Sequence, residues 1–331
     1  MIIHSISNQG LFSLIQKTVS KKLSKKRHIY GPVPSRRLGY SLGIDTIPFK
    51  TCPFNCIYCQ LGKTTLQTER RKRYIPANEI FAELKNFLKN KIHIDHITFS
   101  GSGEPTLNRE IGNLIKKIKK ITDIPIAVIT DSSLLYKPEV RKALLSADVV
   151  LPTLTTAKNK TFKLIHRPLS HITIKRIIDG LAKFRKIYKG EIWLEVMMLK
   201  GINDTEEELK GLKTAIDRIK PDRIQLNTVV RPPSEYSARP LGLQELRRIK
   251  KFFGENCEIV AEFRKQKNIL NFNRKGQIIL QYLKRRPATA MDMSRSLGIS
   301  NKTLLKYLSQ LLKSKKIKRI NYQGKEFYEA I

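Results

Sequence analysis

Short runs of β-branched and other apolar residues alternate with amphipathic stretches between about residue 41 and residue 263. Short apolar runs are typical of buried strands, whereas apolar residues that recur every three or four positions predict helices with one buried face. The runs predict strands at residues 41–47, 95–100, 126–130, 148–153, 191–199, 222–229 and 257–263. The amphipathic stretches predict helices at residues 78–91, 109–121, 138–145, 172–188, 205–219 and 243–253.

Six strand-then-helix units in succession require a parallel sheet with right-handed crossovers. Helix starts agree with this pattern, since Thr205 followed three residues later by Glu208 has the sequence of a capping box. We therefore expect an α/β fold over residues 31–270, in the form of a partial (β/α)6 barrel rather than a full eight-unit barrel. Ligands would then bind at the carboxyl ends of the strands.

The pattern changes after residue 271. Helices are expected at residues 274–285, 289–297 and 301–312, followed by strand-like runs at 317–322 and 325–328 around a turn at Gln323 and Gly324. Three helices followed by a β-hairpin are typical of a winged helix-turn-helix domain. We therefore predict a small C-terminal winged helix domain at residues 271–331, in addition to a basic N-terminal segment at residues 1–30.

The charge of the chain favours polyanionic partners. Its 331 residues include 64 Lys and Arg against 28 Asp and Glu, a formal net charge of +36. Residues 1–30 hold six Lys and Arg and no acid, and residues 271–331 hold 14 Lys and Arg against three acids. Nucleic acid is therefore the expected partner, with RNA favoured over DNA, although winged helices also bind proteins. The N-terminal segment fits a solvated tail, an RNA-facing arm or a helix on a membrane surface.

The candidate nucleic-acid contacts lie on the third helix and the hairpin of the C-terminal segment. They are the polar and basic residues Asn301, Lys302, Thr303, Lys306, Lys318, Arg319 and Lys325. No apolar run approaches the roughly 20 residues of a membrane span, and the first residues lack the charged start of an export signal. Only four Cys are present and three fall within eight residues, which does not suit a disulfide-stapled secreted scaffold. We expect a cytoplasmic protein without a membrane partner.

The strongest chemical pattern is Cys52-Pro-Phe-Asn-Cys56-Ile-Tyr-Cys59, in the loop after the first predicted strand. Three thiolates at this spacing can hold one inorganic cluster and leave a coordination site open to a small molecule. A structural zinc ion would need a fourth ligand, which the loop does not supply, and Cys257 is far away in the chain. A metal cluster is the favoured interpretation, with zinc and a metal-free thiol-rich loop as the alternatives.

A glycine-rich turn, Phe99-Ser-Gly101-Ser-Gly103-Glu104-Pro105, follows the second predicted strand. Glycines let the backbone approach a ligand closely, and the carboxylate of Glu104 can receive a cationic amino group. A Gly-x-Gly turn by itself is often only a tight connection between elements. Its occurrence next to the Cys loop in the expected sheet makes it a candidate cofactor site.

The Cys loop resembles that of radical S-adenosylmethionine (SAM) enzymes. Cys52, Cys56 and Cys59 match the C-x-x-x-C-x-x-C motif that holds a 4Fe-4S cluster in this superfamily. Tyr58 matches the aromatic position beside the adenine of SAM. The resemblance implies that the reduced cluster cleaves SAM to methionine and a 5′-deoxyadenosyl radical, which abstracts hydrogen from a substrate. It also implies an electron donor such as a ferredoxin or flavodoxin.

The glycine-rich turn strengthens the resemblance. Gly101, Gly103 and Glu104 resemble the Gly-Gly-Glu motif that holds the methionine amino group, and Ser102 stands where the first of two adjacent glycines is usual. The segments 31–39, 41–45 and 193–197, together with Asn227, are similar to a poorly characterised subgroup that resembles the wybutosine radical enzymes of tRNA. The chain differs from it at Thr130-Asp131-Ser132-Ser133, where Thr-Asn-Gly-Ser is expected, and at Thr153-Leu154-Thr155, where Ser-Leu-Asp is expected.

Other polar residues are candidates with an ordinary alternative. Glu195 alternates with Leu194 and Val196, so it faces either the cofactor side of the sheet or solvent and helices. Asn227 is open to the same two interpretations, and both residues are included among the candidate cofactor contacts. Residues 166–167 fit a helix cap or an anion contact, and residues 36–37 fit a phosphate contact or a solvated pair.

These features support a radical SAM enzyme that modifies RNA. Two alternatives stay open at this point, namely an iron–sulfur DNA-binding regulator that senses redox state and a radical enzyme that acts on a protein partner. Cys257 is a single spare thiol and cannot hold a second Cys-bound cluster.

Overall fold

The computed structural model describes residues 27–90, 92–260 and 275–331. Most of the basic N-terminal segment and the end of the last predicted strand lie outside the described residues. Within the described ranges, no helix is both long and apolar enough to cross a membrane.

An eight-stranded sheet in the order β1-β2-β5-β6-β7-β8-β9-β10 forms the centre of the fold. Its strands are β1 (Ile29–Ser35), β2 (Gly39–Ile44), β5 (His96–Phe99), β6 (Ile126–Thr130), β7 (Val149–Leu154), β8 (Glu191–Met198), β9 (Arg223–Thr228) and β10 (Cys257–Ile259). All neighbouring pairs are parallel except β1 and β2. The predicted α/β fold with a mostly parallel sheet is confirmed, whereas closure into a partial barrel stays a prediction.

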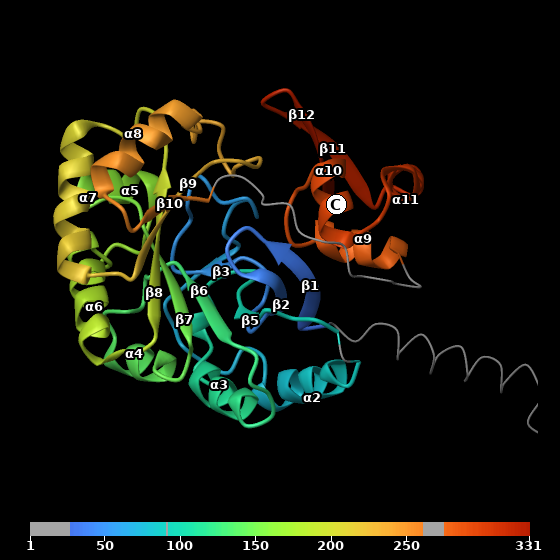
Figure 1. Ribbon diagram of the computed structural model, residues 1–331, viewed down its shortest axis with the longest axis horizontal. Coiled ribbons are helices and arrows are strands. Elements are labelled where there is room, and N and C mark those ends of the chain that lie inside the picture. Colours follow the sequence, from blue (N-terminus) through green and yellow to red (C-terminus); the bar gives the residue numbers. More distant parts are fainter. Residues whose placement is uncertain (1–26, 91, 261–274) are drawn as a thin grey trace, which may run out of the picture.

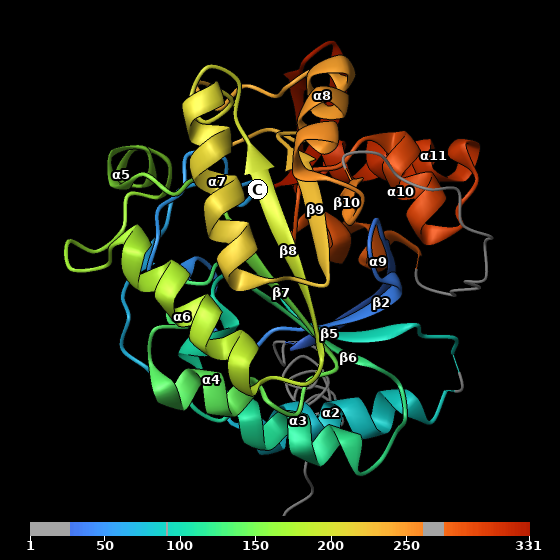
Figure 2. The same cartoon turned by 60° about the vertical axis from the view of Figure 1, so that its left-hand side comes forward.

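Helices connect the parallel strands and cover one face of the sheet (Figures 1 and 2). They are α2 (Ala77–Leu88), α3 (Ile111–Lys119), α4 (Pro138–Leu144), α5 (Asn159–His166), α6 (Ile174–Ile187), α7 (Glu206–Ile219) and α8 (Leu243–Phe253), with a 3-10 turn η1 (Pro105–Leu107). Two short strands, β3 (Thr51–Cys52) and β4 (Leu66–Gln67), pair in parallel outside the main sheet.

The sequence did not predict β1 and α5. The prolines Pro32 and Pro34 make β1 look like a turn, but an edge strand tolerates proline because one of its sides needs no hydrogen bonds. Helix α5 has eight residues, and its N-cap residue Lys158 makes no side-chain hydrogen bond to the first turn, so the helix carries little start signal. The capping box expected at Thr205 is half formed: Thr205 accepts from the Glu208 backbone, but the Glu208 carboxylate accepts from Thr156 and Thr161.

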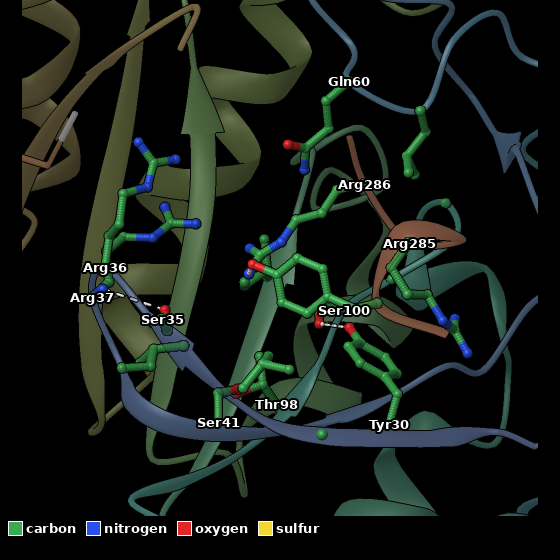
Figure 3. Close-up of a pocket in the computed structure, with 18 of the residues that line it drawn as sticks. Tyr30, Ser35, Arg36, Arg37, Ser41, Gln60, Thr98, Ser100, Arg285 and Arg286 are labelled. Carbon is green, nitrogen blue, oxygen red and sulfur yellow. Dashed lines mark hydrogen bonds between the residues drawn. The ribbon is translucent and has the colours of Figure 1, made fainter. Parts of the chain in front are cut away.

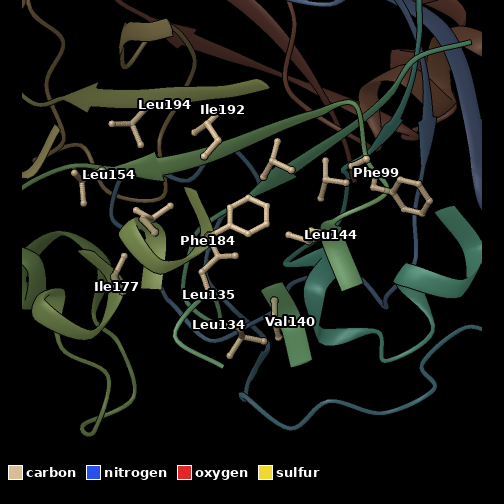
Figure 4. Packing of buried hydrophobic residues seen from close by; sticks show 14 of the residues in the cluster. Phe99, Leu134, Leu135, Val140, Leu144, Leu154, Ile177, Phe184, Ile192 and Leu194 are labelled. Atoms are coloured by element: carbon tan, nitrogen blue, oxygen red, sulfur yellow. The ribbon is translucent and has the colours of Figure 1, made fainter. Parts of the chain in front are cut away.

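Apolar side chains fill the layer between the sheet and its helices (Figure 4). Phe184 of α6 is fully buried in this layer, together with Ile192 and Leu194 of β8. Truncating a buried aromatic ring to alanine costs about 3–5 kcal/mol, so this layer contributes strongly to stability. Because side chains alternate along a strand, the burial of Ile192 and Leu194 against the helices turns Glu195 and Met197 to the other face of the sheet.

The C-terminal elements lie on the side of the sheet away from this arc of helices, next to β1 (Figure 1). They are α9 (Lys275–Leu283), α10 (Ala290–Leu297), α11 (Asn301–Lys313), β11 (Ile317–Tyr322) and β12 (Lys325–Ala330), with β11 and β12 antiparallel. They share a small core of their own, against which Val33 of β1 packs. The order of three helices and a hairpin is the predicted one, and the winged helix assignment stays a prediction.

Two sets of contacts join the C-terminal elements to the sheet. Arg285, just after α9, pairs with Asp45, which follows β2, and its guanidinium lies 4.3 Å from the centre of the Tyr30 ring. On the hairpin, Tyr322 and Phe327 belong to an apolar cluster with residues of the Cys loop and of the segment after β9. The C-terminal elements are therefore docked against the edge of the sheet where the Cys loop begins.

Candidate active site

The three clustered cysteines lie in the loop that follows β2, and all three line one cavity of about 1140 Å³. Each is a free thiol. Burial raises the pKa of Cys52 and Cys56 well above the ordinary thiol value, and the nearby Asp131 carboxylate raises that of Cys52 further. Loading a metal cluster onto these residues would therefore release protons. Among the described residues, no three His, Cys, Asp or Glu side chains are grouped as a single metal ion requires.

Each cysteine sulfur has a polar neighbour. Lys50 Nζ donates to Cys59 Sγ at 3.1 Å, and Cys52 Sγ donates to Asp131 Oδ2 at 3.0 Å. His166 Nδ1 lies 3.1 Å from Cys56 Sγ. Donors beside thiolate ligands are a general means of adjusting the reduction potential of an iron–sulfur cluster. One buried and two half-buried thiols, with donors beside two of them, form a set that fits such a cluster.

His166 is the last residue of α5, and Arg167 caps that helix in the left-handed conformation with φ 44°. The predicted capping role is therefore confirmed for Arg167, whereas His166 points to the Cys loop. Burial lowers the pKa of His166 to about 3, so its imidazole is neutral at physiological pH. Thr155 Oγ1 lies 2.8 Å from Nε2, and a hydroxyl donated there leaves the Nδ1 proton for Cys56. The sequence carried no spacing signal for this contact.

The glycine-rich turn packs directly on the Cys loop. A Cβ added to Gly103 would lie 2.1 Å from the Thr51 carbonyl oxygen, and Gly101 has φ +121°, which side chains rarely adopt. Glu104 N donates to that same Thr51 carbonyl at 3.1 Å. Ser102, which replaces a glycine of the expected motif, donates from N and Oγ to Asp45. The two glycines are thus needed for the close approach of the two loops.

Glu104 is 1% exposed, and its carboxylate lies at the wall of the cavity. Its Oε1 accepts from Thr130 Oγ1 at 2.9 Å, and its Oε2 accepts from Asp131 N at 2.7 Å. Burial raises the pKa of Glu104 well above its ordinary value, and the Asp131 carboxylate raises it further. A cationic amino group placed here would relieve the repulsion between the two carboxylates. Ser132, where a glycine was expected, takes φ 69° and so keeps the glycine conformation.

Glu195 and Asn227 meet on the face of the sheet that lines the cavity. Asn227 Nδ2 donates to Glu195 Oε1 at 2.8 Å, and Arg37 Nη1 lies 3.1 Å from the same oxygen. Burial alone would raise the pKa of Glu195, but the Arg37 charge and the Asn227 hydrogen bond hold it below its ordinary value. The carboxylate is therefore ionised at neutral pH, and of the two predicted orientations the structure has the one that faces the cavity.

The structure brings most of the predicted site residues together. Tyr58, Gly101, Gly103, Glu104, Glu195 and Asn227 line the same cavity as the three cysteines. Among the basic residues of the described lining, sequence reasoning missed Lys50, Arg231, Arg285 and Arg286. Arg231 carries a weak signal, because it follows a strand end where parallel sheets bind ligands. Figure 3 shows the part of the cavity where Arg36, Arg37 and Arg286 lie.

The predicted nucleic-acid contacts lie elsewhere. Asn301, Lys302, Thr303 and Lys306 are on the first two turns of α11, and none of them is among the residues described as lining the cavity. On the hairpin, Lys318 Nζ pairs with Glu329 at 3.2 Å and Arg319 Nη1 with Glu326 at 3.5 Å. Lys325 is exposed on β12. These cations are on the surface, while the apolar residues Tyr322 and Phe327 pack inward.

Comparison with known proteins decides the family. A sequence model described as the radical SAM superfamily matches residues 46–212, which include the Cys loop and the glycine-rich turn. The chain belongs to the radical SAM superfamily. Members of this superfamily use a 4Fe-4S cluster and SAM, so these are the cofactors of this radical SAM protein.

Individual proteins of similar sequence add to this placement. A UPF0026 protein of Methanocaldococcus jannaschii is 33% identical over 306 residues, which cover 90% of this chain and 94% of that protein. A protein named GTPase Obg from Brachyspira hyodysenteriae is 42% identical over 308 residues; the match covers 92% of this chain but only 45% of that protein. A dual-specificity RNA methyltransferase RlmN from Buchnera aphidicola is 26% identical over 259 residues, which cover 66% of this chain and 69% of that protein.

A solved structure supports the fold. Streptococcus suis SuiB bound to S-adenosylmethionine has a TM-score of 0.50 at 17% sequence identity, covering 79% of this chain and 57% of that chain. At this identity the likeness concerns the fold alone. The radical SAM membership and the cofactors predicted from the sequence are thus confirmed, whereas the similarity to the wybutosine enzymes stays a prediction.

Proposed function

We propose that this radical SAM protein is an enzyme that modifies RNA, with the 4Fe-4S cluster held by Cys52, Cys56 and Cys59. The observation that carries the proposal is that one cavity is lined by these thiols, the glycine-rich turn and the Glu195–Asn227 pair. When bound and reduced, the cluster supplies the electron that splits SAM into methionine and the radical that abstracts hydrogen. The chain's own residues bind and orient the two reactants.

The roles follow from the contacts. Glu104 and Asp131 would receive the methionine amino group, because the Asp131 carboxylate contacts Cys52 Sγ and is near enough to Glu104 to raise its pKa. Gly101 and Gly103 would let the backbone approach the methionine end. Tyr58, which lines the cavity beside Cys59, would contact the adenine. Residues 195 and 227 would hold polar groups of SAM or of the substrate.

RNA is the proposed substrate because of the basic C-terminal elements. Residues 271–331 hold 14 Lys and Arg against three acids, and an exposed basic surface binds phosphates through release of counterions. The helix order fits a winged helix-turn-helix, with the candidate contacts on α11 and the hairpin. The similarity to RlmN, named as an RNA methyltransferase, agrees with RNA as the substrate. A cytoplasmic ferredoxin or flavodoxin would supply the electron.

The test is release of 5′-deoxyadenosine from SAM. The chain is purified without oxygen, supplied with iron and sulfide, and given a strong chemical reductant, beside a Cys56→Ala variant. We expect cleavage by the wild type only. Addition of RNA should then increase the cleavage of SAM or yield a modified nucleoside in the RNA. A fully loaded cluster that never cleaves SAM would refute the enzyme and favour an iron–sulfur regulator instead.

A further inference from the structure

Three arginines from distant parts of the chain line the same cavity. Arg36 follows β1, Arg231 follows β9 and Arg286 follows α9. Figure 3 shows Arg36 at one side of this region and Arg286 nearer its middle. Arg231 is 5% exposed and donates from Nη1 to Gln60 Oε1 at 3.2 Å. Gln60 directly follows Cys59, so Arg231 lies beside the Cys loop.

The three guanidinium groups influence one another electrostatically. Burial lowers the pKa of Arg36 to about 9, and the charges of Arg231, Arg37 and Arg286 contribute. Burial and then the charge of Arg286 lower the pKa of Arg231 to about 10. Arg36 and Arg231 stay charged at neutral pH. Holding like charges together away from water is unfavourable, and an anion placed between them would offset that cost.

Hydrogen bonds to neighbouring residues fix the orientation of the three guanidinium groups. Arg36 Nη1 donates to Asn227 Oδ1 at 3.2 Å, and Arg286 Nη2 donates to the Tyr282 hydroxyl at 2.8 Å. With the Arg231 bond to Gln60, each of these three bonds uses one terminal nitrogen of a guanidinium and a neutral oxygen. A planar guanidinium carries five N–H donors, which lets it contact several oxygens at once. The group is thus oriented by its surroundings before any ligand binds.

The cavity also has room for more than SAM. Its described lining holds seven Lys and Arg side chains against four Asp and Glu side chains. Its volume of about 1140 Å³ exceeds the roughly 300–1,000 Å³ of a site for one small molecule. Of the four acids, Glu104 and Asp131 lie at the cysteines and Glu195 pairs with Arg37. Of the cations, Lys50 lies at Cys59 and Arg37 and Arg285 pair with acids, so Arg36, Arg231 and Arg286 form a separate basic part of the lining.

We propose that the substrate carries a phosphate group that binds between Arg36, Arg231 and Arg286. A tetrahedral phosphate presents several oxygens to several guanidiniums at once, which a single carboxylate does not, and arginine matches its geometry. The assignment of this phosphate to the substrate rests on the proposed function, since SAM itself carries no phosphate. Because Arg286 belongs to the C-terminal elements, they complete the substrate site as well as covering it.

Calorimetric titration with inorganic pyrophosphate tests the site without any radical reaction. The variants are Arg286→Gln and Arg231→Gln, and the control is Arg295→Gln, which removes an exposed charge of α10 that does not line the cavity. Loss of one charge-assisted contact should weaken binding about tenfold or more in the first two variants. The control should bind like the wild type. Equal affinities in all three variants would overturn the proposal.

Competition experiments identify the source of the phosphate. SAM should bind together with pyrophosphate; mutual displacement would overturn the proposal and assign the arginines to the SAM carboxylate. Displacement by a 5′-phosphorylated single-stranded RNA supports a nucleotide of RNA as the source, and displacement only by the free mononucleotide supports a small phosphorylated substrate. SAM cleavage is measured separately. If the wild type cleaves SAM but pyrophosphate binding does not depend on the arginines, this inference alone is refuted. If pyrophosphate binding depends on the arginines but SAM is not cleaved, the proposed function alone is refuted.

Discussion

Replacing Arg285 with glutamine tests whether the C-terminal elements hold the glycine-rich turn in place. Arg285 Nη1 pairs with Asp45 and lies 3.2 Å from Ser102 Oγ. Asp45 accepts in turn from Ser102 N at 3.1 Å and from Ser102 Oγ at 2.6 Å. Only 6% of Asp45 is exposed, so the substitution removes the arginine that neutralises a buried carboxylate.

The contacts set the expected size of the effect. Removing one partner of a buried ion pair costs about 3–5 kcal/mol. Two features reduce this value here: the Arg285 side chain is 20% exposed, so water screens part of the attraction, and Asp45 keeps both hydrogen bonds from Ser102. We therefore expect Arg285→Gln to lower the free energy of unfolding by about 1–3 kcal/mol. The amides of Gly101 and Gly103 should exchange with deuterium faster.

The assay compares urea unfolding and amide exchange of Arg285→Gln with those of Arg295→Gln, an exposed arginine of α10. Asp45→Asn and the double variant complete a cycle that isolates the pair. Equal unfolding energies and equal exchange rates in the two arginine variants would refute the reasoning. Strictly additive effects of the Arg285 and Asp45 substitutions would do the same.

Two further predictions concern the cavity wall. His166→Phe removes the imidazole whose Nδ1 lies 3.1 Å from Cys56 Sγ. Because donors to the cluster sulfurs favour the reduced state, the reduction potential of the cluster should fall by tens of millivolts in a spectroelectrochemical titration, and by less in His166→Asn. Equal potentials in the wild type and both variants would contradict this. Burial would raise the pKa of Glu195, but the Arg37 charge and the Asn227 hydrogen bond, with smaller contributions from Arg36 and Thr153, together keep it low. The stabilising contribution of Glu195 is therefore complete above the unfolded pKa of about 4.3 and is lost as pH falls through the lower folded pKa. Glu195→Gln should therefore destabilise the cluster-free protein by about 3 kcal/mol at neutral pH, and by less under acid, in urea unfolding; a difference that does not change with pH would contradict the assignment.

The parallel sheet could be predicted because strands buried on both faces appear as short apolar runs. The strand expected at residues 126–130 is β6 with those same bounds, and the other predicted strands that lie wholly within the described residues end within three residues of the predicted positions. The alternation of Glu195 with Leu194 and Val196 correctly identified two faces, but only the packing of α6 and α7 on one of them decides which face lines the cavity. Burial against a distant element leaves no mark in the local pattern.

The Cys loop and the glycine-rich turn could be predicted because each is a continuous motif with fixed spacing. The arginine group could not, since Arg36, Arg231 and Arg286 belong to three segments whose meeting depends on how the C-terminal elements dock. The contact between His166 and Cys56 could not be predicted either. Helix α5 carries little start signal, and its last residue reaches the Cys loop only through the fold. Continuous motifs therefore identified the side of the cavity that holds the cysteines and the glycine-rich turn, and the fold alone assembled its basic side.

The proposed RNA surface gives a prediction in which ion pairs decide the order of effects. Lys302 and Lys306 are exposed on α11, whereas Lys318 and Arg319 already pair with glutamates across the hairpin. A paired cation neutralises less phosphate, because its carboxylate partner must first be displaced. Removing both α11 lysines should reduce the slope of log affinity against log salt by about 1.4 for single-stranded RNA.

Fluorescence anisotropy with a labelled RNA measures this slope over a salt series. Lys302→Gln with Lys306→Gln should flatten the dependence more than Lys318→Gln with Arg319→Gln, although each pair removes two charges. The matched number of charges excludes net charge as the cause of any difference. If the hairpin variant flattens the slope more, the glutamates do not mask those cations and the hairpin carries the phosphate contacts. If neither variant changes it, phosphate binding belongs to the cavity arginines and the exposed C-terminal surface serves another partner.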